Sequence, residues 1–237
     1  MNATPAALAS NLASVRDRIA AAERHSGRPV GSVTLIGVVK TLPAQVIAEA
    51  VALGLTDLGE NTVQETEGHQ RAIGRTAVRW HMIGHLQRNK AGRALQLFDV
   101  VHGVDDAGLA GALARRAHAA GRRQPVLIEV NVSGEASKFG VAPENAAALA
   151  DEVAALAELH LLGLMTVGAP VAAPEAARPG FARLRELRDE LARRIGAPLA
   201  ELSMGMSGDY EVAVEEGATM VRVGTALFGA RKAHGGV

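Results

Sequence analysis

The chain has 237 residues, 48% hydrophobic and 21% charged, a composition typical of globular proteins rather than disordered or fibrous ones. Its 25 Lys and Arg residues balance 25 Asp and Glu residues, so there is no surplus of positive charge to attract nucleic acid or an anionic membrane. Cysteine is absent, which excludes disulfides, a thiolate nucleophile and Cys-based metal sites. No apolar run approaches the roughly 18 residues of a membrane span, and charged residues interrupt any signal-peptide core. We therefore expect a cytoplasmic protein.

The first predicted element is a helix that begins at Thr4-Pro5, a capping residue followed by the residue best suited to the first helical position. Its apolar face comprises Leu8, Leu12, Val15 and Ile19. The next segment, Val33–Val39, is short, apolar and β-branched, as in a strand buried on both faces. Pro43 begins a second helix, and Gly54 ends it.

The strand-then-helix unit then repeats along the chain. Further strands are predicted at Thr56–Leu58, Val78–Ile83, Asp99–Val104, Pro125–Val132, Leu159–Thr166, Ala200–Met204 and Met220–Val223. The clearest helices between them are predicted at Ala107–Ala120, Pro143–Leu159, Pro179–Ile195 and Asp209–Glu216, and Ala169–Gly180 is predicted to be a long loop. Eight such units predict a single α/β domain over residues 1–237, a (β/α)8 TIM barrel preceded by one extra N-terminal helix. An open doubly wound sheet is the alternative.

Lys40 stands at the end of the first predicted strand, where parallel barrels carry their chemistry. Only four of the 25 basic residues are lysines, so an amine in this place is unusual for this chain. An amine among apolar strands loses part of its hydration, which frees its lone pair to attack a carbonyl carbon. Lys40 is therefore a candidate Schiff-base lysine. The alternative is a structural lysine that reaches solvent at the barrel mouth or pairs with a carboxylate.

The loops after the seventh and eighth strands predict an anion site. Phosphate groups bind between these two loops in many such barrels, and Ser207 is predicted to begin a helix there. Gly224-Thr225 offers backbone amides and a hydroxyl, although Ser207 and Gly224 taken singly are equally well explained as a helix cap and a tight turn. The negative charges of Asp209 and Glu211 compete with an anion at this place. A phosphate site near a lone lysine fits pyridoxal 5′-phosphate (PLP) or a phosphosugar.

Six segments of the chain resemble signatures of a known family, in the family's order. They are Val38–Pro43, Gly59–Glu65, Trp80–Lys90, Gly163–Thr166, Leu202–Ser207 and Val221–Gly229. The family is that of the YggS/PROSC pyridoxal phosphate homeostasis proteins, and the similarity covers nearly the whole chain. Leu42 replaces a lysine that many relatives carry, Thr62 replaces their usual tyrosine, and Gly208 stands where they carry alanine or an acidic residue.

The resemblance implies a barrel similar to the N-terminal domain of bacterial alanine racemase, with PLP as its cofactor. It implies that Lys40 holds the cofactor as an internal aldimine and that Asn61 lies beside it. It further implies that Arg222 faces the pyridine nitrogen. The phosphate would be bound by Ser207, Gly224 and Thr225.

We predict that the protein buffers PLP or delivers it to PLP-dependent apoenzymes, as a monomer and without turnover of its own. A racemase needs a second base, which alanine racemase takes from an additional domain, whereas the only tyrosine here, Tyr210, opens the last predicted helix. The second hypothesis is a small racemase or related enzyme that uses Lys40 and a second base such as His81. The third is a Schiff-base aldolase acting on a phosphosugar.

Three weaker signals are interpreted without a further function. His81 and His85 straddle a strand end and have no carboxylate at ligand spacing, so we expect no metal site. The Gly205–Asp209 segment lacks the final glycine of a nucleophile elbow. Lys138, in the loop after the fifth strand, is interpreted as a solvated surface amine, with a second cofactor contact as the alternative.

Overall fold

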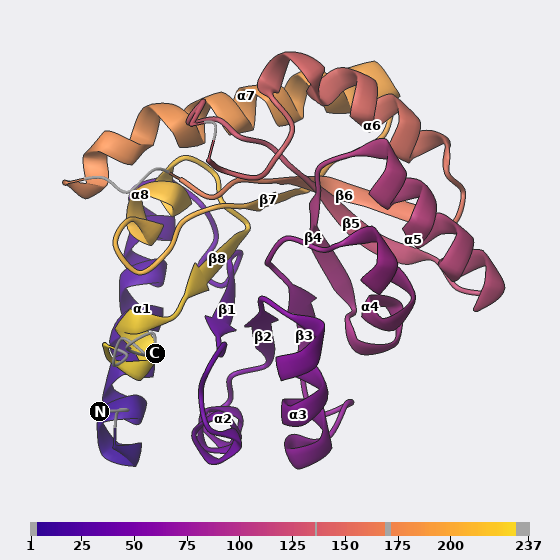
Figure 1. The fold of residues 1–237 in the computed structure, drawn as a ribbon. Helices are drawn as coiled ribbons and strands as arrows, with labels where there is room; N and C mark the ends of the chain where they lie inside the picture. Colours follow the sequence, from indigo (N-terminus) through magenta and orange to yellow (C-terminus); the bar gives the residue numbers. More distant parts are fainter. Residues whose placement is uncertain (1–3, 136, 169–171, 231–237) are drawn as a thin grey trace.

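The computed structural model describes residues 4–135, 137–168 and 172–230, in which eight parallel strands close into a barrel in the order of the sequence (Figure 1). The strands are β1 Thr34–Val38, β2 Asp57–Glu60, β3 Arg79–Met82, β4 Val100–Val104, β5 Gln124–Glu129, β6 Leu159–Met165, β7 Glu201–Ser203 and β8 Met220–Val223. The closed order confirms the (β/α)8 barrel and contradicts the open sheet.

Helices connect the strands around the outside of the barrel (Figure 1). The α-helices are α1 Pro5–His25, α2 Ala44–Ala52, α3 Val63–Ile73, α4 Ala91–Leu97, α5 Ala107–Ala119, α6 Ala146–Ala155, α7 Arg178–Ile195, α8 Tyr210–Glu215 and α9 Thr225–Phe228. Short 3-10 helices are η1 Arg88–Lys90, η2 Pro143–Asn145 and η3 Pro174–Ala177. Across the described ranges, no helix combines the length and the apolar character that crossing a membrane requires.

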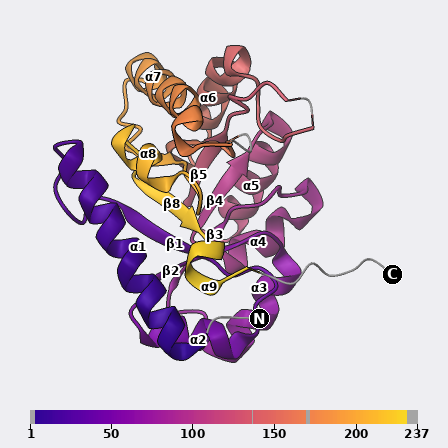
Figure 2. The ribbon, with the colours of Figure 1, turned by 90° about the vertical axis from the view of Figure 1, so that its left-hand side faces the viewer.

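Helix α1 is the predicted extra helix, and it lies along the outside of the barrel against α2, α8 and α9 (Figure 2). The Thr4 hydroxyl accepts a hydrogen bond from the Ala7 amide at 3.3 Å, as expected of an N-cap. Near its other end, the buried Glu23 carboxylate accepts hydrogen bonds from the amides of Gly31 and Val33 at 2.9 and 2.8 Å. These bonds fix the path from α1 into β1.

The core has two layers, because successive strand residues face opposite sides of the barrel wall. Outward-facing residues such as Trp80 and Ile128 pack against the helices in one large apolar cluster. A second apolar cluster of Val100, Leu127 and Met165 lies apart from it, inside the barrel. The remaining interior is unusually polar, and this polarity shapes the candidate site.

The structure corrects three predicted boundaries. Strand β1 ends at Val38, so Lys40 lies in the following turn rather than in the strand. Helix α8 begins at Tyr210 instead of Ser207, because the Asp209 carboxylate accepts a hydrogen bond from the Met206 amide at 2.6 Å and holds residues 206–209 as a turn.

The stretch predicted as a long loop, 169–180, is also partly helical. It contains η3 and the first residues of α7, each with proline in a first-turn position, and η3 ends in two alanines, which are strong helix formers. Residues 169–171 of that prediction lie outside the described residues.

Candidate functional site

Lys40 lies at the carboxyl-terminal mouth of the barrel, in the turn between β1 and α2, and is half-buried. Its neighbours Val39 and Leu42 belong to the large apolar cluster between the strands and the helices. Ile36 and Val38 are also buried but do not belong to that cluster. The alternation along β1 therefore assigns Lys40 to the lumen side. In the register of the sheet Val38 pairs with Gly59, which places Lys40 beside the end of β2 and Asn61.

The turn that carries Lys40 is strained and is held by side chains of α3. Thr41 has φ +62°, a left-handed conformation that no other non-glycine among the described residues adopts and that a β-branched side chain disfavours. The Thr41 amide donates to Glu65 Oε1 at 3.2 Å, and the carbonyl of Leu42 accepts from His69 Nε2 at 2.9 Å. Thr62, where relatives carry tyrosine, caps α3 by accepting from the Glu65 amide at 3.3 Å.

A buried ion pair supports this turn from behind. The Nδ1 of His69 contacts Oε1 of Glu60, a residue with 0% exposure. Because a carbonyl oxygen only accepts, His69 carries a hydrogen on Nε2, and the proton shared with Glu60 lies between Nδ1 and Oε1. The hydrogen bond to Glu60 raises the pKa of His69, and burial raises the pKa of Glu60. Among the described residues, Oε2 of Glu60 has no hydrogen-bond partner.

Two backbone amides next to β1 converge on one oxygen. Gly224 and Ala226, at the end of β8 and the start of α9, both donate to the Ser207 hydroxyl at 3.2 Å. The prediction that Ser207 begins and caps α8 is therefore wrong, because its hydroxyl reaches across to the loop after β8. Thr225 lies between the two amides and is exposed. This arrangement of amide and hydroxyl groups matches the needs of an anionic oxygen.

The acidic residues expected to compete with an anion are engaged elsewhere. Glu211 accepts from Arg18 of α1 at 2.6 Å, and Asp209 accepts from the Met206 amide. Neither carboxylate makes a hydrogen bond to the Gly224 or Ala226 amides.

Arg222 extends from β8 into the lumen and is only 4% exposed. Its Nη1 donates to Ser203 Oγ at 2.6 Å, and its Nη2 donates to the Thr166 carbonyl at 2.7 Å. Burial lowers the pKa of Arg222 to about 10, so the guanidinium stays charged at neutral pH. Within the described part of the chain, its Nε–H has no protein acceptor, and no carboxylate lies within ion-pair distance.

Asn61 is positioned by close backbone packing. A Cβ placed on Gly84 would lie 2.5 Å from the Asn61 carbonyl oxygen, so only glycine permits this approach. A Cβ on Gly103, one strand further, would lie 2.9 Å from the Gly84 carbonyl oxygen and 3.3 Å from Glu129 Oε2. The loops after β2 and β3 and the last residues of β4 thus lie against one another along this side of the mouth, next to the Glu129 carboxylate.

Glu129, which the sequence analysis did not single out, ends β5 on the side of the barrel opposite β1. It is 5% exposed, and burial raises its pKa to about 7, with Asp105 acting in the same direction and Arg222 against it. A carboxyl group of this kind takes up and releases a proton near neutral pH.

The histidine proposed as a second base is not available to a substrate. Both ring nitrogens of His81 are used inside the lumen, by Asp57 at 2.9 Å and by His102 at 2.9 Å. Asp57 and His102 were missed in the sequence, although a polar residue in an otherwise apolar strand was a visible signal for His102. The described residues contain no group of three or more His, Cys, Asp or Glu that could hold a metal.

Lys138 corrects another prediction, because it is not a solvated surface amine. Its side chain is 18% exposed, with Nζ donating to the Gly168 carbonyl at 3.0 Å and pairing with Glu135 at 3.0 Å. It ties the loop after β5 to the loop after β6. Next to it, the exposed Phe139 stacks on His85, with ring centroids 4.0 Å apart.

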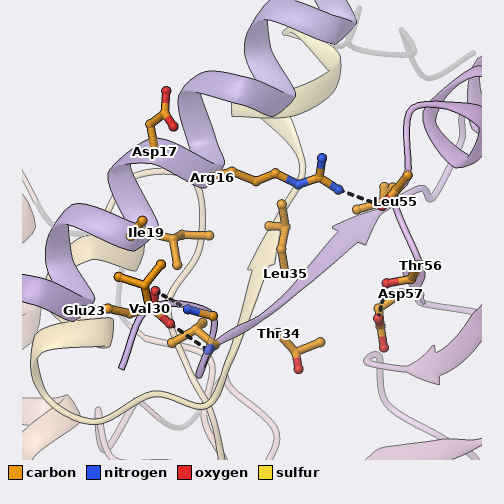
Figure 3. Close-up of a pocket in the computed structure, with 14 residues that line it drawn as sticks. Arg16, Asp17, Ile19, Glu23, Val30, Thr34, Leu35, Leu55, Thr56 and Asp57 are labelled. Atoms are coloured by element: carbon orange, nitrogen blue, oxygen red, sulfur yellow. Dashed lines mark hydrogen bonds between the residues drawn. The ribbon is translucent and has the colours of Figure 1, made fainter. Parts of the chain in front are cut away.

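A separate pocket lies at the opposite end of β1, between α1 and the starts of β1 and β2 (Figure 3). Its wall includes Arg16, which donates to the Gly54 carbonyl at 2.6 Å, and Asp57. Because Lys40 lies beyond the other end of β1, this pocket is not the site described above.

Comparison with known proteins gives consistent relatives. The family profile "Alanine racemase, N-terminal domain" matches residues 10–232. The pyridoxal phosphate homeostasis protein of Aquifex aeolicus is 45% identical over 93% of this chain and 97% of its own. That of Pseudomonas aeruginosa is 46% identical over 94% of this chain and 96% of its own.

A solved structure agrees with these relatives. PipY of Synechococcus elongatus PCC7942, with PLP bound, is 36% identical and superimposes with a TM-score of 0.83 over 94% of this chain and 100% of its own. On these similarities, the chain belongs to the YggS/PROSC family of pyridoxal phosphate homeostasis proteins.

Proposed function

We propose that this protein binds PLP at the mouth of the barrel, with its aldehyde bonded to the amine of Lys40. The observation that carries the proposal is the convergence of the Gly224 and Ala226 amides on the Ser207 hydroxyl, beside the strand that leads to Lys40. A phosphate oxygen can replace that hydroxyl as acceptor. The bound PLP named for PipY supports the choice of ligand.

The other groups at the mouth fit the same ligand. PLP has an anionic phosphate, a ring nitrogen that accepts a hydrogen bond, and an aldehyde that condenses with an amine. Arg222 offers its Nε–H to the ring nitrogen, Asn61 flanks the ring, and Thr225 adds a hydroxyl at the phosphate end. The guanidinium, cationic at neutral pH, keeps a facing ring nitrogen unprotonated.

We propose further that the protein stores PLP or passes it to PLP-dependent apoenzymes in the cytoplasm, as a monomer of one domain over residues 1–237, without turnover of its own. The names of the relatives support homeostasis. The engagement of both His81 nitrogens and the burial of Tyr210 in the core argue against either as a second base. Sedimentation of the loaded protein tests the monomer, and transfer to an apoenzyme tests delivery.

The absorbance spectrum of the PLP-loaded protein tests the binding proposal. We expect a band near the violet that disappears on borohydride reduction and is absent in Lys40→Ala, with the circular dichroism of the fold unchanged. Lys90→Ala is the matched control, because Lys90 ends η1 and its charge acts on Glu67 of the outer helix α3, so its loss should leave the band intact. A band of wild-type intensity in Lys40→Ala would refute the role of Lys40.

Glu129 favours a second candidate function, an amino-acid racemase or related enzyme. Its carboxyl group lies on the lumen side opposite β1, with a pKa of about 7 that suits a general base. Exchange of the α-hydrogen of added amino acids for deuterium tests this candidate. Exchange that depends on both Lys40 and Glu129 would favour an enzyme, whereas its absence in PLP-loaded protein favours the carrier.

A further inference from the structure

Five polar side chains in the lumen form one continuous chain of four hydrogen bonds. Arg222 Nη1 donates to Ser203 Oγ at 2.6 Å, and Ser203 Oγ lies 2.9 Å from His102 Nδ1. His102 Nε2 lies 2.9 Å from His81 Nδ1, and His81 Nε2 lies 2.9 Å from Asp57 Oδ1. The three middle residues are fully buried. We call this set the lumen chain.

When both histidine rings are neutral and Asp57 is ionised, one placement of hydrogens satisfies the lumen chain. The guanidinium of Arg222 can only donate and an ionised Asp57 can only accept. Starting from Asp57, a neutral His81 must therefore donate from Nε2 and accept at Nδ1 from His102 Nε2. A neutral His102 then accepts at Nδ1 from the Ser203 hydroxyl, which accepts from Arg222, so that all four bonds point from Arg222 to Asp57.

The charges agree with this order. Burial lowers the pKa of both His81 and His102, which keeps the two rings neutral. Although burial opposes it, the hydrogen bond from His81 lowers the pKa of Asp57, which keeps that carboxylate ionised. Hydrogen bonds aligned in one direction polarise and strengthen one another in a low-dielectric interior.

The path of the lumen chain explains why Arg222 needs it. The chain crosses from β8 and β7 to β4, β3 and β2, and its two ends return to either side of β1, where Ile36 pairs in register with both Arg222 and Asp57. Two inter-strand spacings, about 9.5 Å, separate the backbones at those ends. The side chains of Arg222 and Asp57 make no direct ion pair, because each is engaged by the lumen chain. The guanidinium is thus oriented only by neutral oxygens, and one of them, Ser203 Oγ, is itself oriented by the chain.

We propose that Ser203, His102, His81 and Asp57 are positioning residues that aim Arg222 at the unprotonated ring nitrogen of a bound pyridine ligand. This proposal rests on the proposed function, because it needs a pyridine ring at the mouth. It goes beyond that function because it assigns a role in recognising the ring nitrogen to four residues that do not contact the ligand. It also predicts which part of the ligand senses them: the ring nitrogen rather than the phosphate or the aldehyde.

Binding of pyridoxine 5′-phosphate to the unliganded protein tests the proposal by calorimetry. This ligand has an alcohol in place of the aldehyde, so it cannot bond to Lys40, and its analogue with C–H in place of the ring nitrogen removes the Arg222 contact. We expect His102→Leu to lower the affinity for pyridoxine 5′-phosphate about tenfold and to leave the affinity for the analogue unchanged. His102→Gln, whose amide can both accept and donate, should recover most of the affinity.

The control is Val100→Ala, two residues before His102 on the same strand and equally buried inside the barrel. It should lower stability without a selective loss for the ligand with a ring nitrogen. Should His102→Leu not fold, Ser203→Ala interrupts the lumen chain one residue closer to Arg222, by removing the acceptor of its Nη1, with a smaller change in volume. Equal loss for both ligands, or no loss for either, would overturn the proposal. A wild-type protein that binds neither PLP nor pyridoxine 5′-phosphate would instead overturn the proposed function.

Nitrogen-15 NMR of the unliganded protein gives a readout that needs no ligand. At pH 7 we expect His81 and His102 to be neutral with the hydrogen on Nε2. A hydrogen on Nδ1 of either ring, or a charged ring, contradicts the ordered chain. In Ser203→Ala the His102 signals should broaden or shift, because its Nδ1 loses the donor that fixes the tautomer.

Discussion

Substitution of Gly84 tests whether backbone packing positions Asn61. A methyl group at Gly84 would lie 2.5 Å from the Asn61 carbonyl oxygen and 2.9 Å from its Cα, so the Asn61 backbone must retreat by roughly 1 Å. Both contacts are with backbone, which cannot rotate away as a side chain can. We expect Gly84→Ala to lower the free energy of unfolding by about 1–3 kcal/mol, the usual cost of overpacking.

The same shift should reach the ligand. Because Asn61 is proposed to lie beside the PLP ring, its displacement should weaken PLP binding by roughly 1 kcal/mol, about fivefold. Urea unfolding measures the first effect, and titration of the unliganded protein with PLP measures the second.

Gly68→Ala is the matched control. Gly68 lies within α3, and a Cβ there meets no atom within 4 Å. Alanine should therefore raise the free energy of unfolding by about 0.5–1 kcal/mol through helix propensity, with PLP affinity unchanged. The reasoning is refuted if Gly84→Ala matches the wild type in stability, or if it loses stability and still binds PLP normally.

Three further substitutions test single contacts. Burial raises the pKa of Glu129 to about 7, so the folded state holds this proton more tightly than the unfolded state, and the free energy of unfolding falls as pH rises from about 4.5 to 7. In urea unfolding, Glu129→Gln should remove that fall and be more stable than the wild type at pH 8 by up to about 3 kcal/mol. An unchanged pH profile would contradict the shift. Ser207→Ala should lower the affinity for PLP about fivefold and leave the affinity for pyridoxal, which lacks the phosphate, unchanged. An equal loss of affinity for both ligands would place Ser207 away from the phosphate. Glu23→Ala leaves the Gly31 and Val33 amides without their acceptor and should lower the free energy of unfolding, measured by thermal unfolding, by about 2–3 kcal/mol. A loss below about 0.5 kcal/mol would contradict this role of Glu23.

The barrel was predictable because its signals are local. The apolar run at Val33–Val39 and the Thr4-Pro5 helix start each depend on residues within one element, and the structure confirms both. The start of α8 was not predictable in this way. Ser207 has the chemistry of a cap, but its hydroxyl instead accepts from the amide of Gly224, which follows β8, and from that of Ala226 in α9, residues 17 and 19 positions away.

In the candidate site, too, residues with a local signal were predictable and residues joined by long-range contacts were not. Lys40 and Arg222 were visible as charged residues at strand ends, and family resemblance supplied their roles. The lumen chain was not visible, because it joins β8, β7, β4, β3 and β2 through bonds that span up to 101 positions. Lys138 was misjudged for a related reason: the carbonyl of Gly168 that binds its amine is 30 residues away.

The two basic side chains of the site are held in opposite ways, and this difference bears on the proposed carrier. Arg222 lies within a strand, buried, with two hydrogen bonds and an ordered chain behind it. Lys40 lies past the end of its strand, half-buried, on a turn whose next residue is in a strained conformation. A carrier that delivers PLP to an apoenzyme, as proposed above, would have to break the bond to Lys40. The ordered hydrogen bonds of Arg222 and the strained residue beside Lys40 favour release that begins at the amine.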